Sequence, residues 1–226
     1  MSRDNLILHM QQIKDELLIM GSLVEIATVK AVDALRRRDT NAARTIYLDD
    51  QVVNQKRYTI ENDVLILIAT QQPMARDLRR LAAMLEIASE LERMGDYAKG
   101  ICKVILNLDD ADIPIPIKEI EKMAQIAVEL LHQSLTAFLE EDADKARAIP
   151  QQDDQVDQLF NTAERFIIKT MVEQPEIIDH ANLLMWVAHN IERMADRVTN
   201  ICERTIFVVT GELTELEVKP KNLFDN

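Results

Sequence analysis

The sequence contains one five-residue signature twice. Glu92-Arg93-Met94-Gly95-Asp96 is followed 100 positions later by Glu192-Arg193-Met194-Ala195-Asp196, in a chain of 226 residues. The match extends from Ala88–Cys102 onto Ala188–Cys202, which is too long to arise from composition alone. A tandem duplication divides the chain into halves of roughly 110 residues, close to the common size of one domain. The sequence therefore predicts two similar structural units.

The composition is that of a helical protein. The chain contains only four glycines and six prolines, which leaves little room for the turns that join β-strands, and it is rich in good helix formers. Apolar residues recur at helical spacing along most of its length. We therefore expect an all-α fold in which the repeat unit is an antiparallel three-helix bundle.

Three helices are expected in each half. In the first half they run from about Leu6 to Leu35, from Asp39-Thr40 to Gln71-Gln72-Pro73, and from about Met74 to Leu108. In the second half they run from Ile117 to about Leu139, from the break at Glu141-Asp142 to about Glu173, and from about Ile177 to Val209.

Acidic residues and prolines mark the boundary between the halves. The segment 109–116 combines three aspartates with Pro114 and Pro116, and it is the clearest linker in the chain. The expected organisation is a first three-helix repeat at 1–108, a linker at 109–116, a second repeat at 117–210 and a polar C-terminal tail at 211–226. We expect the tail to be poorly ordered.

The chain is strongly acidic, with a formal net charge of −13. Such a protein is a poor partner for nucleic acid, because affinity for the phosphate backbone comes from clustered Lys and Arg. A cation or a basic protein surface is the expected partner instead.

The two cysteines and the apolar segments indicate the compartment. Cys102 and Cys202 occupy equivalent positions on the apolar sides of their helices, which suits buried free thiols in a reducing compartment. The first residues lack the basic and apolar regions of a secretory signal. The longest apolar run, Val64–Ala69, has six residues, far fewer than the roughly 20 that span a bilayer. We expect a cytoplasmic protein without a transmembrane segment.

The duplicated signature places two acids on one helical face. Glu92 and Asp96 are separated by four residues, so their side chains lie roughly 5–6 Å apart and destabilise the helix unless something neutralises them. The preceding helix carries Asp50 and Asn54 at the same spacing. Packed helices lie about 8–10 Å apart, so these four residues are expected to face one another across a groove.

The second repeat contains a matching set. Its members are Asp153, Asp157, Glu192 and Asp196, with an acid where the first repeat has Asn54. Oxygen ligands of this kind suit Fe³⁺, Mn²⁺, Mg²⁺ or Ca²⁺, and the absence of paired Cys or His ligands disfavours zinc. Two alternatives need no metal: a solvated acidic face, or salt bridges from Arg93 to Asp96 and from Arg193 to Asp196.

Signatures of catalysis are missing from the sequence. A ferritin-like diiron oxidase needs Glu-x-x-His on two helices, but His189-Asn190-Ile191-Glu192 has the reverse order and Ser89 stands at the equivalent position. The sequence also lacks a nucleophile-and-base pattern, a Gly-rich phosphate loop and a redox cysteine pair. We expect a non-enzymatic protein without an organic cofactor. Five methionines are interpreted as core residues: Met74, Met84, Met94, Met185 and Met194.

These residues together resemble a known family. The duplicated Glu-Arg-Met-x-Asp helices, the segment Gln72-Pro73-Met74-Ala75-Arg76-Asp77-Leu78-Arg79 and the preceding Asp50-x-x-x-Asn54 look like those of PhoU proteins, bacterial accessory and regulatory proteins of phosphate transport. The resemblance covers nearly the whole chain. It implies two three-helix bundles side by side in a cytoplasmic protein, commonly a homodimer.

The resemblance also implies a function and a metal role. PhoU proteins repress the phosphate-starvation response when phosphate is plentiful, acting with the Pst phosphate ABC transporter, including its ATPase subunit, and a sensor histidine kinase. Some carry multinuclear iron clusters on their E/D-x-x-x-D motifs. By resemblance, this metal role falls on Glu92, Asp96, Glu192, Asp196, Asp153 and Asp157.

The two halves depart from the family pattern at different places. Asn54 brings an uncharged oxygen to the first set, which weakens that set as a metal site. The second half reads Gln174-Pro175-Glu176-Ile177-Ile178-Asp179 where the first has Gln72 to Asp77. We therefore expect halves that are not functionally equivalent.

Two other functions stay open at this stage. The carboxylates could form a metal-dependent enzyme site, because clustered metals activate water, or the protein could be a plain helical scaffold. Phosphate sensing is expected to be indirect, because a net-negative chain without a Gly-rich loop is a poor phosphate receptor.

Overall fold

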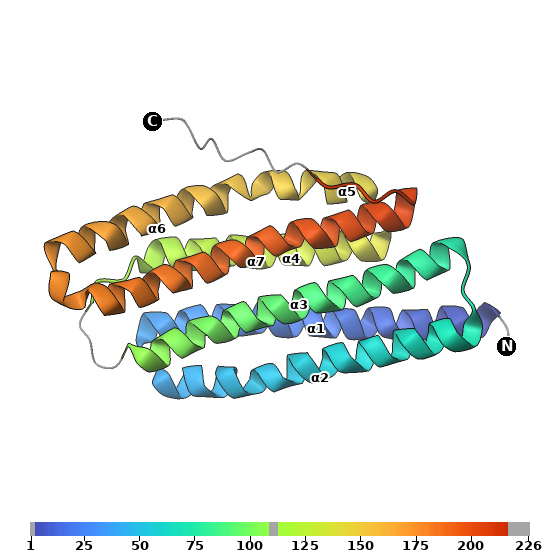
Figure 1. Cartoon of the computed structure of the whole chain (residues 1–226), viewed down its shortest axis with the longest axis horizontal. Coiled ribbons are helices and arrows are strands. Elements are labelled where there is room, and N and C mark those ends of the chain that lie inside the picture. Colours follow the sequence, from blue (N-terminus) through green and yellow to red (C-terminus); the bar gives the residue numbers. More distant parts are fainter. Residues whose placement is uncertain (1–2, 109–112, 217–226) are drawn as a thin grey trace.

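The computed structural model describes residues 3–108 and 113–216, and these residues form helices, turns and no strand. Helices α1 to α3 form one antiparallel bundle and α4 to α7 form a second one beside it (Figure 1). The expected all-α tandem repeat is therefore confirmed. The first part of the expected linker, 109–112, and the last part of the expected tail, 217–226, lie outside the described residues.

The first bundle follows the expected pattern. Its helices are α1 (Arg3–Arg37), α2 (Thr40–Gln71) and α3 (Ala75–Asn107). Asp39 caps α2, because its side chain accepts a hydrogen bond of 2.9 Å from the backbone N–H of Ala42. The helix ends at Gln71, and the next residue, Gln72, has a left-handed backbone conformation directly before Pro73.

The second bundle differs from the expectation in one helix. Its elements are α4 (Ile117–Glu140), α5 (Ala143–Ala148), η1 (Pro150–Gln152), α6 (Asp154–Glu173), η2 (Pro175–Ile177) and α7 (Ile178–Thr210). A continuous helix from Glu141-Asp142 to Glu173 was expected, and this prediction is wrong. Pro150 has no N–H group and its ring crowds the preceding turn, so the chain passes through η1 before α6 begins.

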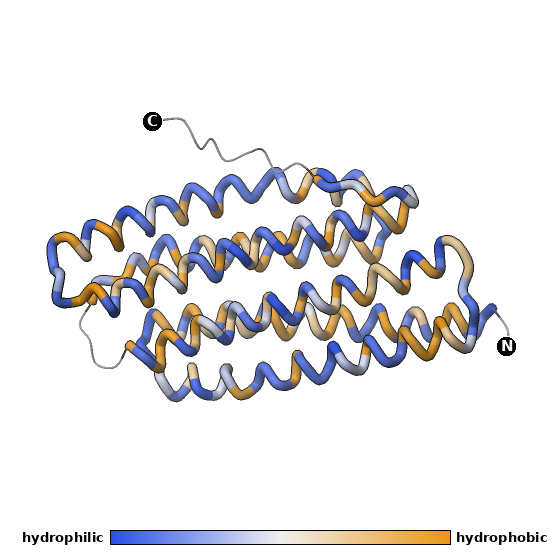
Figure 2. Tube along the Cα trace, viewed as in Figure 1, coloured by the Kyte–Doolittle hydropathy of each residue, from blue (hydrophilic) through white to orange (hydrophobic). Residues whose placement is uncertain are grey.

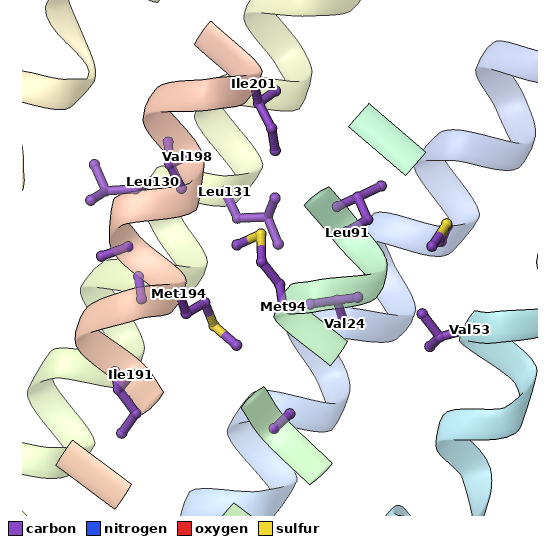
Figure 3. Close-up of a cluster of buried hydrophobic side chains, with 14 of the residues drawn as sticks. Val24, Val53, Leu91, Met94, Leu130, Leu131, Ile191, Met194, Val198 and Ile201 are labelled. Carbon is purple, nitrogen blue, oxygen red and sulfur yellow. The ribbon is translucent and has the colours of Figure 1, made fainter. Parts of the chain in front are cut away.

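Hydrophobic residues recur along every helix (Figure 2) and meet in one core that continues from the first bundle into the second. Met94 of α3 and Met194 of α7 extend into the space between the bundles (Figure 3). The hydroxyl of Thr28 in α1 donates a hydrogen bond of 3.5 Å to the sulfur of Met194. The contact joins α1 of the first repeat to the signature methionine of the second.

Four of the five methionines match their expected place. Met84, Met94 and Met194 are buried, and Met185 packs against the core. Met74 is 79% exposed, so the prediction is wrong for this residue. It lies in the turn between Pro73 and the first residue of α3, where the chain has not yet reached the bundle.

Both cysteines are buried free thiols, as expected. Burial raises the pKa of Cys102 to about 12, and it raises the pKa of Cys202 to about 12 as well. The thiolate form that reacts with electrophiles is therefore rare at neutral pH. Among the helices of the described residues, none is long and apolar enough to cross a bilayer.

Polar side chains also cross the contact between α3 and α7. Glu90 is only 6% exposed and accepts hydrogen bonds of 3.1 Å from Asn200 and 3.4 Å from Arg197. Arg197 also donates through Nε to the hydroxyl of Tyr97 at 3.4 Å. The guanidinium of Arg193 lies over the Tyr97 ring, 5.9 Å from its centroid. Because these groups are directional, they fix how the two helices align.

A second polar link holds the bundles together at the α4–α5 turn. Arg80 of α3 donates to both carboxylate oxygens of Glu141, at 2.6 Å and 3.1 Å. Arg76 also donates to Glu141, and the ammonium of Lys14 lies 3.9 Å away. Burial alone would raise the pKa of Glu141, but the Arg80 hydrogen bond and the charges of Arg80, Arg76 and Lys14 outweigh it and lower that pKa.

Replacing Glu141 with glutamine is expected to lower the free energy of unfolding by about 1–2 kcal/mol at pH 7, because charge-assisted hydrogen bonds between the bundles are lost. The lowered pKa means that the folded state favours the carboxylate. The contribution is therefore present above pH 4.5 and is lost as the pH falls through the folded pKa. Urea unfolding of both proteins at pH 7 and pH 3 measures the difference and its disappearance.

Glu140→Gln is the matched control, because Glu140 pairs with Lys145 inside its own bundle and is half exposed. Equal effects of the two substitutions at pH 7 would show that the link between the bundles adds no stability.

Candidate functional site

The first acid set consists of Asp50, Asn54, Glu92 and Asp96, and the structure places it where α2 faces α3. Asp50 is 7% exposed on α2, and the charges of Asp50 and Asp96 both act on Glu92 of α3. Burial raises the pKa of Glu92 first of all, and the neighbouring charge of Asp96 raises it further. The expected meeting of α2 and α3 acids is therefore present in the first repeat.

Two basic side chains neutralise the first acid set. The ammonium of Lys99 lies 2.7 Å from Asp50 Oδ2 and 3.7 Å from Asp96 Oδ1. The hydrogen bond to Asp50 raises the pKa of Lys99. Arg57 of α2 brings its Nη1 atom to 3.6 Å from Glu92 Oε2. Each of the three carboxylates therefore has a protein cation close by.

Asn54 takes part in this set through its nitrogen. Its Nδ2 donates a hydrogen bond of 3.1 Å to Asp50 Oδ2, so the amide supports the carboxylate and does not extend the oxygen cluster. Arg93 forms a salt bridge with Glu90, at 3.4 Å. Asp96 has Lys99 as its cation.

The second acid set consists of Asp153, Asp157, Glu192 and Asp196. Asp153 and Glu192 are 5% and 7% exposed, and the Oδ1 atoms of Asp153 and Asp157 are buried. Asp153 directly precedes α6 and Asp157 lies in its first turn, where the partial positive charge of a helix N-terminus favours carboxylates. The break at Pro150 creates this helix start, so it has an electrostatic consequence for the site.

Aromatic side chains border the second acid set. The Nδ1 atom of His189 lies 3.4 Å from Glu192 Oε2. The His189 ring contacts Trp186 edge to face, with centroids 6.3 Å apart, and Phe160 at the same distance in a tilted arrangement. Trp186 is the only tryptophan in the sequence. It contacts His189, which in turn contacts Glu192.

The two sets differ in the residues around the acids. The offset of 103 residues that aligns Asp50 with Asp153 also aligns Arg57 with Phe160. The offset of 100 residues that aligns Asp96 with Asp196 also aligns Lys99 with Thr199. The first set therefore combines three carboxylates with two cations, and the second brings four carboxylates without a basic residue at either position.

Neither set is a finished metal cage. Within 3–108 and 113–216, no three or more His, Cys, Asp or Glu side chains form a group that could hold a metal ion. A metal at the second set would therefore require its side chains to draw together around the ion, as flexible carboxylate sites do.

Sequence reasoning missed the residues that separate the two sets. Lys99 lies three positions after Asp96 in one signature helix and is replaced by threonine in the other, so a comparison of the copies beyond their acids would have found it. The same comparison would have found Arg57, because the corresponding position of the second repeat holds Phe160. His189 lies on α7 with a partly exposed side chain, and its contact with Glu192 was not considered in the sequence analysis.

Comparison with known proteins agrees with this architecture. The model of the PhoU domain matches the chain twice, at residues 17–105 and 120–205. A phosphate-specific transport system accessory protein PhoU homolog from Clostridium acetobutylicum is 34% identical over 92% of this chain and 95% of its own length. The PhoU accessory protein of Edwardsiella tarda is 32% identical over 90% of this chain and 84% of its own length.

Solved structures give the same result. The crystal structure of the phosphate transport system regulatory protein PhoU from Streptococcus pneumoniae superposes with a TM-score of 0.86 at 33% identity, over 93% of this chain and all of that one. PhoU from Pseudomonas aeruginosa superposes with a TM-score of 0.84 at 30% identity, over 90% of this chain and 98% of that one. The repeated domain, the matched length and the shared fold together show that this chain belongs to the PhoU family.

Proposed function

We propose that this protein is an accessory regulator of phosphate-specific transport. The observation that carries the proposal is the pair of PhoU domains that cover most of the chain and match phosphate-transport accessory proteins along nearly their whole length. The proposed action is negative regulation of phosphate uptake and of the phosphate-starvation response, which maintains phosphate homeostasis in the cell.

The proposed mechanism is that of a cytoplasmic adaptor between the ATPase subunit of a Pst-type transporter and a sensor histidine kinase. The strongly acidic chain suits a basic patch on such a partner, and association through charge weakens as salt rises. We propose that the protein is not an enzyme: its thiols are buried with a raised pKa, and the three carboxylates of the first acid set are paired with lysine or arginine.

A homodimer is part of the proposal. Large apolar side chains are exposed along one helix pair of the first bundle: on α1 they are Ile7, Leu8, Leu18, Ile19, Ile26 and Val29, and on α2 they are Tyr47, Leu48, Val52, Tyr58, Leu65 and Ile66. Exposed apolar surface of this extent is typical of faces that bind another protein. A second copy of the chain is the occupant that the proposal assigns to it.

We also propose that the second acid set binds a hard metal ion such as iron, Mn²⁺, Mg²⁺ or Ca²⁺. Four carboxylates supply the oxygen ligands, and their mutual repulsion favours a cation. A bound ion at this place would neutralise charge and tie α6 to α7, and no organic cofactor is proposed. Phosphate is proposed to be sensed through the partners and not bound directly.

The regulatory role is tested by alkaline phosphatase activity in phosphate-replete cells that lack this protein. Deletion is expected to raise the activity, and the wild-type gene is expected to restore repression. A variant with Glu92, Asp96, Glu192 and Asp196 all changed to alanine is expected to remain folded and to fail in repression, because the acid sets have been removed.

The matched control changes Asp144, Glu173 and Glu176 to alanine, because these acids lie outside both sets, and it should repress like the wild type. Unchanged phosphatase activity on deletion would remove the regulatory proposal and favour a scaffold or an enzyme.

Metal binding is tested with Trp186 as the reporter. Titration of metal-free protein with Mn²⁺ or Mg²⁺ is expected to change its fluorescence and saturate, because the contact with His189 couples the ring to Glu192. A hundredfold excess over Kd should stabilise the fold by about 2.7 kcal/mol and raise the melting temperature by roughly 5–10 °C. Asp157→Asn and Glu192→Gln should each weaken both responses, and Asp154→Asn should leave them unchanged.

A flat titration with no shift in melting temperature would reject a metal at the second acid set. Retention of both responses in Glu192→Gln would place the ion elsewhere in the protein.

A further inference from the structure

Charge is distributed unequally between the two halves of the chain. Residues 1–108 contain 15 Asp or Glu and 15 Lys or Arg, so their formal charge is zero. The whole net charge of −13 therefore belongs to residues 109–226. A large net charge of one sign opposes the association of two copies. Two copies that meet through their first halves avoid this repulsion.

The helices that open the two bundles, α1 and α4, differ in what they expose. Five large apolar side chains of α1 are each about half exposed: Ile7, Leu8, Ile19, Ile26 and Val29. Every exposed position of α4 holds a polar residue: Lys118, Lys122, Gln125, Glu129, His132 and Glu140. The apolar outer side of α1 is therefore a feature of this helix and not of the fold in general. With the exposed apolar side chains of α2, it forms the α1–α2 face.

Two cavities open between α1 and α2. The larger one, of about 460 Å³, lies where the start of α1 meets the end of α2 and is lined by residues that include His9, Ile13 and Ile66. The smaller one, of about 110 Å³, lies further along both helices. The ion pair between Lys56 and Glu16 crosses from α2 to α1 between the two cavities. The α1–α2 face is therefore a groove with two hollows and not a flat surface.

The smaller cavity has mostly apolar walls. Its lining includes five apolar side chains from α1 and α2: Leu23, Ile26, Ala27, Ile46 and Val53. An apolar cavity of about 150 Å³ is large enough to bind benzene. The smaller cavity therefore has room for one aliphatic side chain from outside.

Gly95 of α3 keeps the base of the smaller cavity open. A Cβ atom at this position would lie 3.3 Å from Val53 Cγ1 and 3.4 Å from Asp50 Oδ1, so even alanine would crowd the base. The other copy of the signature has Ala195 at the equivalent position. Lys99 and Asn54 both donate to Asp50 at Oδ2, which draws the polar contacts of this carboxylate to one of its two oxygens.

We propose that the α1–α2 face binds the same face of a second copy around a two-fold axis, and that one apolar side chain of each copy enters the smaller cavity of the other. The proposal rests on the homodimer proposed above and gives it a location. A two-fold interface uses one patch on both copies, so the patch has to fit itself. This patch offers exposed apolar side chains and a cavity that accepts one. The acidic second repeats remain outside the contact and stay available to a basic partner.

The first test adds bulk at the cavity. Ala27 lines the cavity and is partly exposed, and leucine is a good helix former. Ala27→Leu is expected to raise the Kd of the dimer at least tenfold, because the seated side chain of the second copy loses its place. Sedimentation equilibrium of the full-length protein measures the Kd, and circular dichroism checks the fold. Ala148→Leu is the matched control, because it adds the same side chain at an exposed position of the second repeat.

The second test places charge on the face. Ile26→Lys combined with Val52→Lys is expected to give a folded monomer, because both side chains are about half exposed in one chain and would be buried in the dimer. Ile168→Lys combined with Val172→Lys makes the same exchange on α6 of the second repeat and is expected to leave the dimer intact. This pair of variants decides the proposal if Ala27→Leu does not fold.

The third test measures protection of the face by thiol labelling. The native cysteines are buried and react slowly, since burial raises the pKa of each to about 12. The thiol of Val52→Cys is expected to be labelled more slowly at protein concentrations above the Kd than below it. The thiol of Val172→Cys is expected to be labelled at the same rate in both.

Salt adds an independent readout. A neutral, apolar contact is expected to keep the same Kd at low and high salt, since there is little charge to screen. A wild-type dimer that forms only at high salt would indicate contact through the acidic halves and would overturn the location.

The outcomes separate this proposal from the homodimer itself. A wild-type dimer whose Kd is unchanged by Ala27→Leu and by the lysine pair at Ile26 and Val52 would overturn the location and leave the homodimer standing. Loss of the dimer in the α6 variant alone would place the contact on the second repeat. A wild-type chain that stays monomeric at every concentration would remove the homodimer and this proposal together, and would leave the α1–α2 face for a different protein.

Discussion

The contact between α3 and α7 is the interaction on which the rest of the structure depends. These are the two copies of one helix, and they run antiparallel along the middle of the molecule (Figure 1). Equivalent positions are exchanged across the contact: Glu90 meets Asn200, and Gly100 meets Asn190 so closely that a Cβ atom would lie 2.7 Å from the amide nitrogen. A duplicated helix can therefore supply both sides of its own interface with small and polar residues in matching register.

This contact decides where the acids lie. Because α3 packs against α7 on one side and α2 on another, the acids of the first signature can lie beside α2, where the charge of Asp50 acts on Glu92. The two acid sets therefore lie apart, one in each bundle. Like-charged carboxylates at this spacing destabilise a helix, and the two copies have different surroundings. The first copy has Lys99 and Arg57 beside its acids, and the second has a helix start that favours Asp153 and Asp157.

Much of the fold could be predicted from the sequence, because apolar residues recur at helical spacing along most of the chain and the signature occurs in both halves. The apolar seam of α3, with Ala88, Leu91, Ala98 and Cys102, is buried as its spacing predicts. The break at Pro150 was missed because the helical spacing of apolar residues was given more weight than this single proline. Met74 was misplaced because hydrophobicity alone does not say whether a turn reaches the core. The bridge from Lys99 to Asp50 depends on how α2 and α3 align, and a single sequence does not contain that register.

The second acid set and the contact between the bundles share one helix. Asp196 of the set directly precedes Arg197, which donates to Glu90 in the other bundle, and Asn200 lies one turn after Asp196. A change of charge at the set therefore acts within one helical turn of the groups that align α3 with α7.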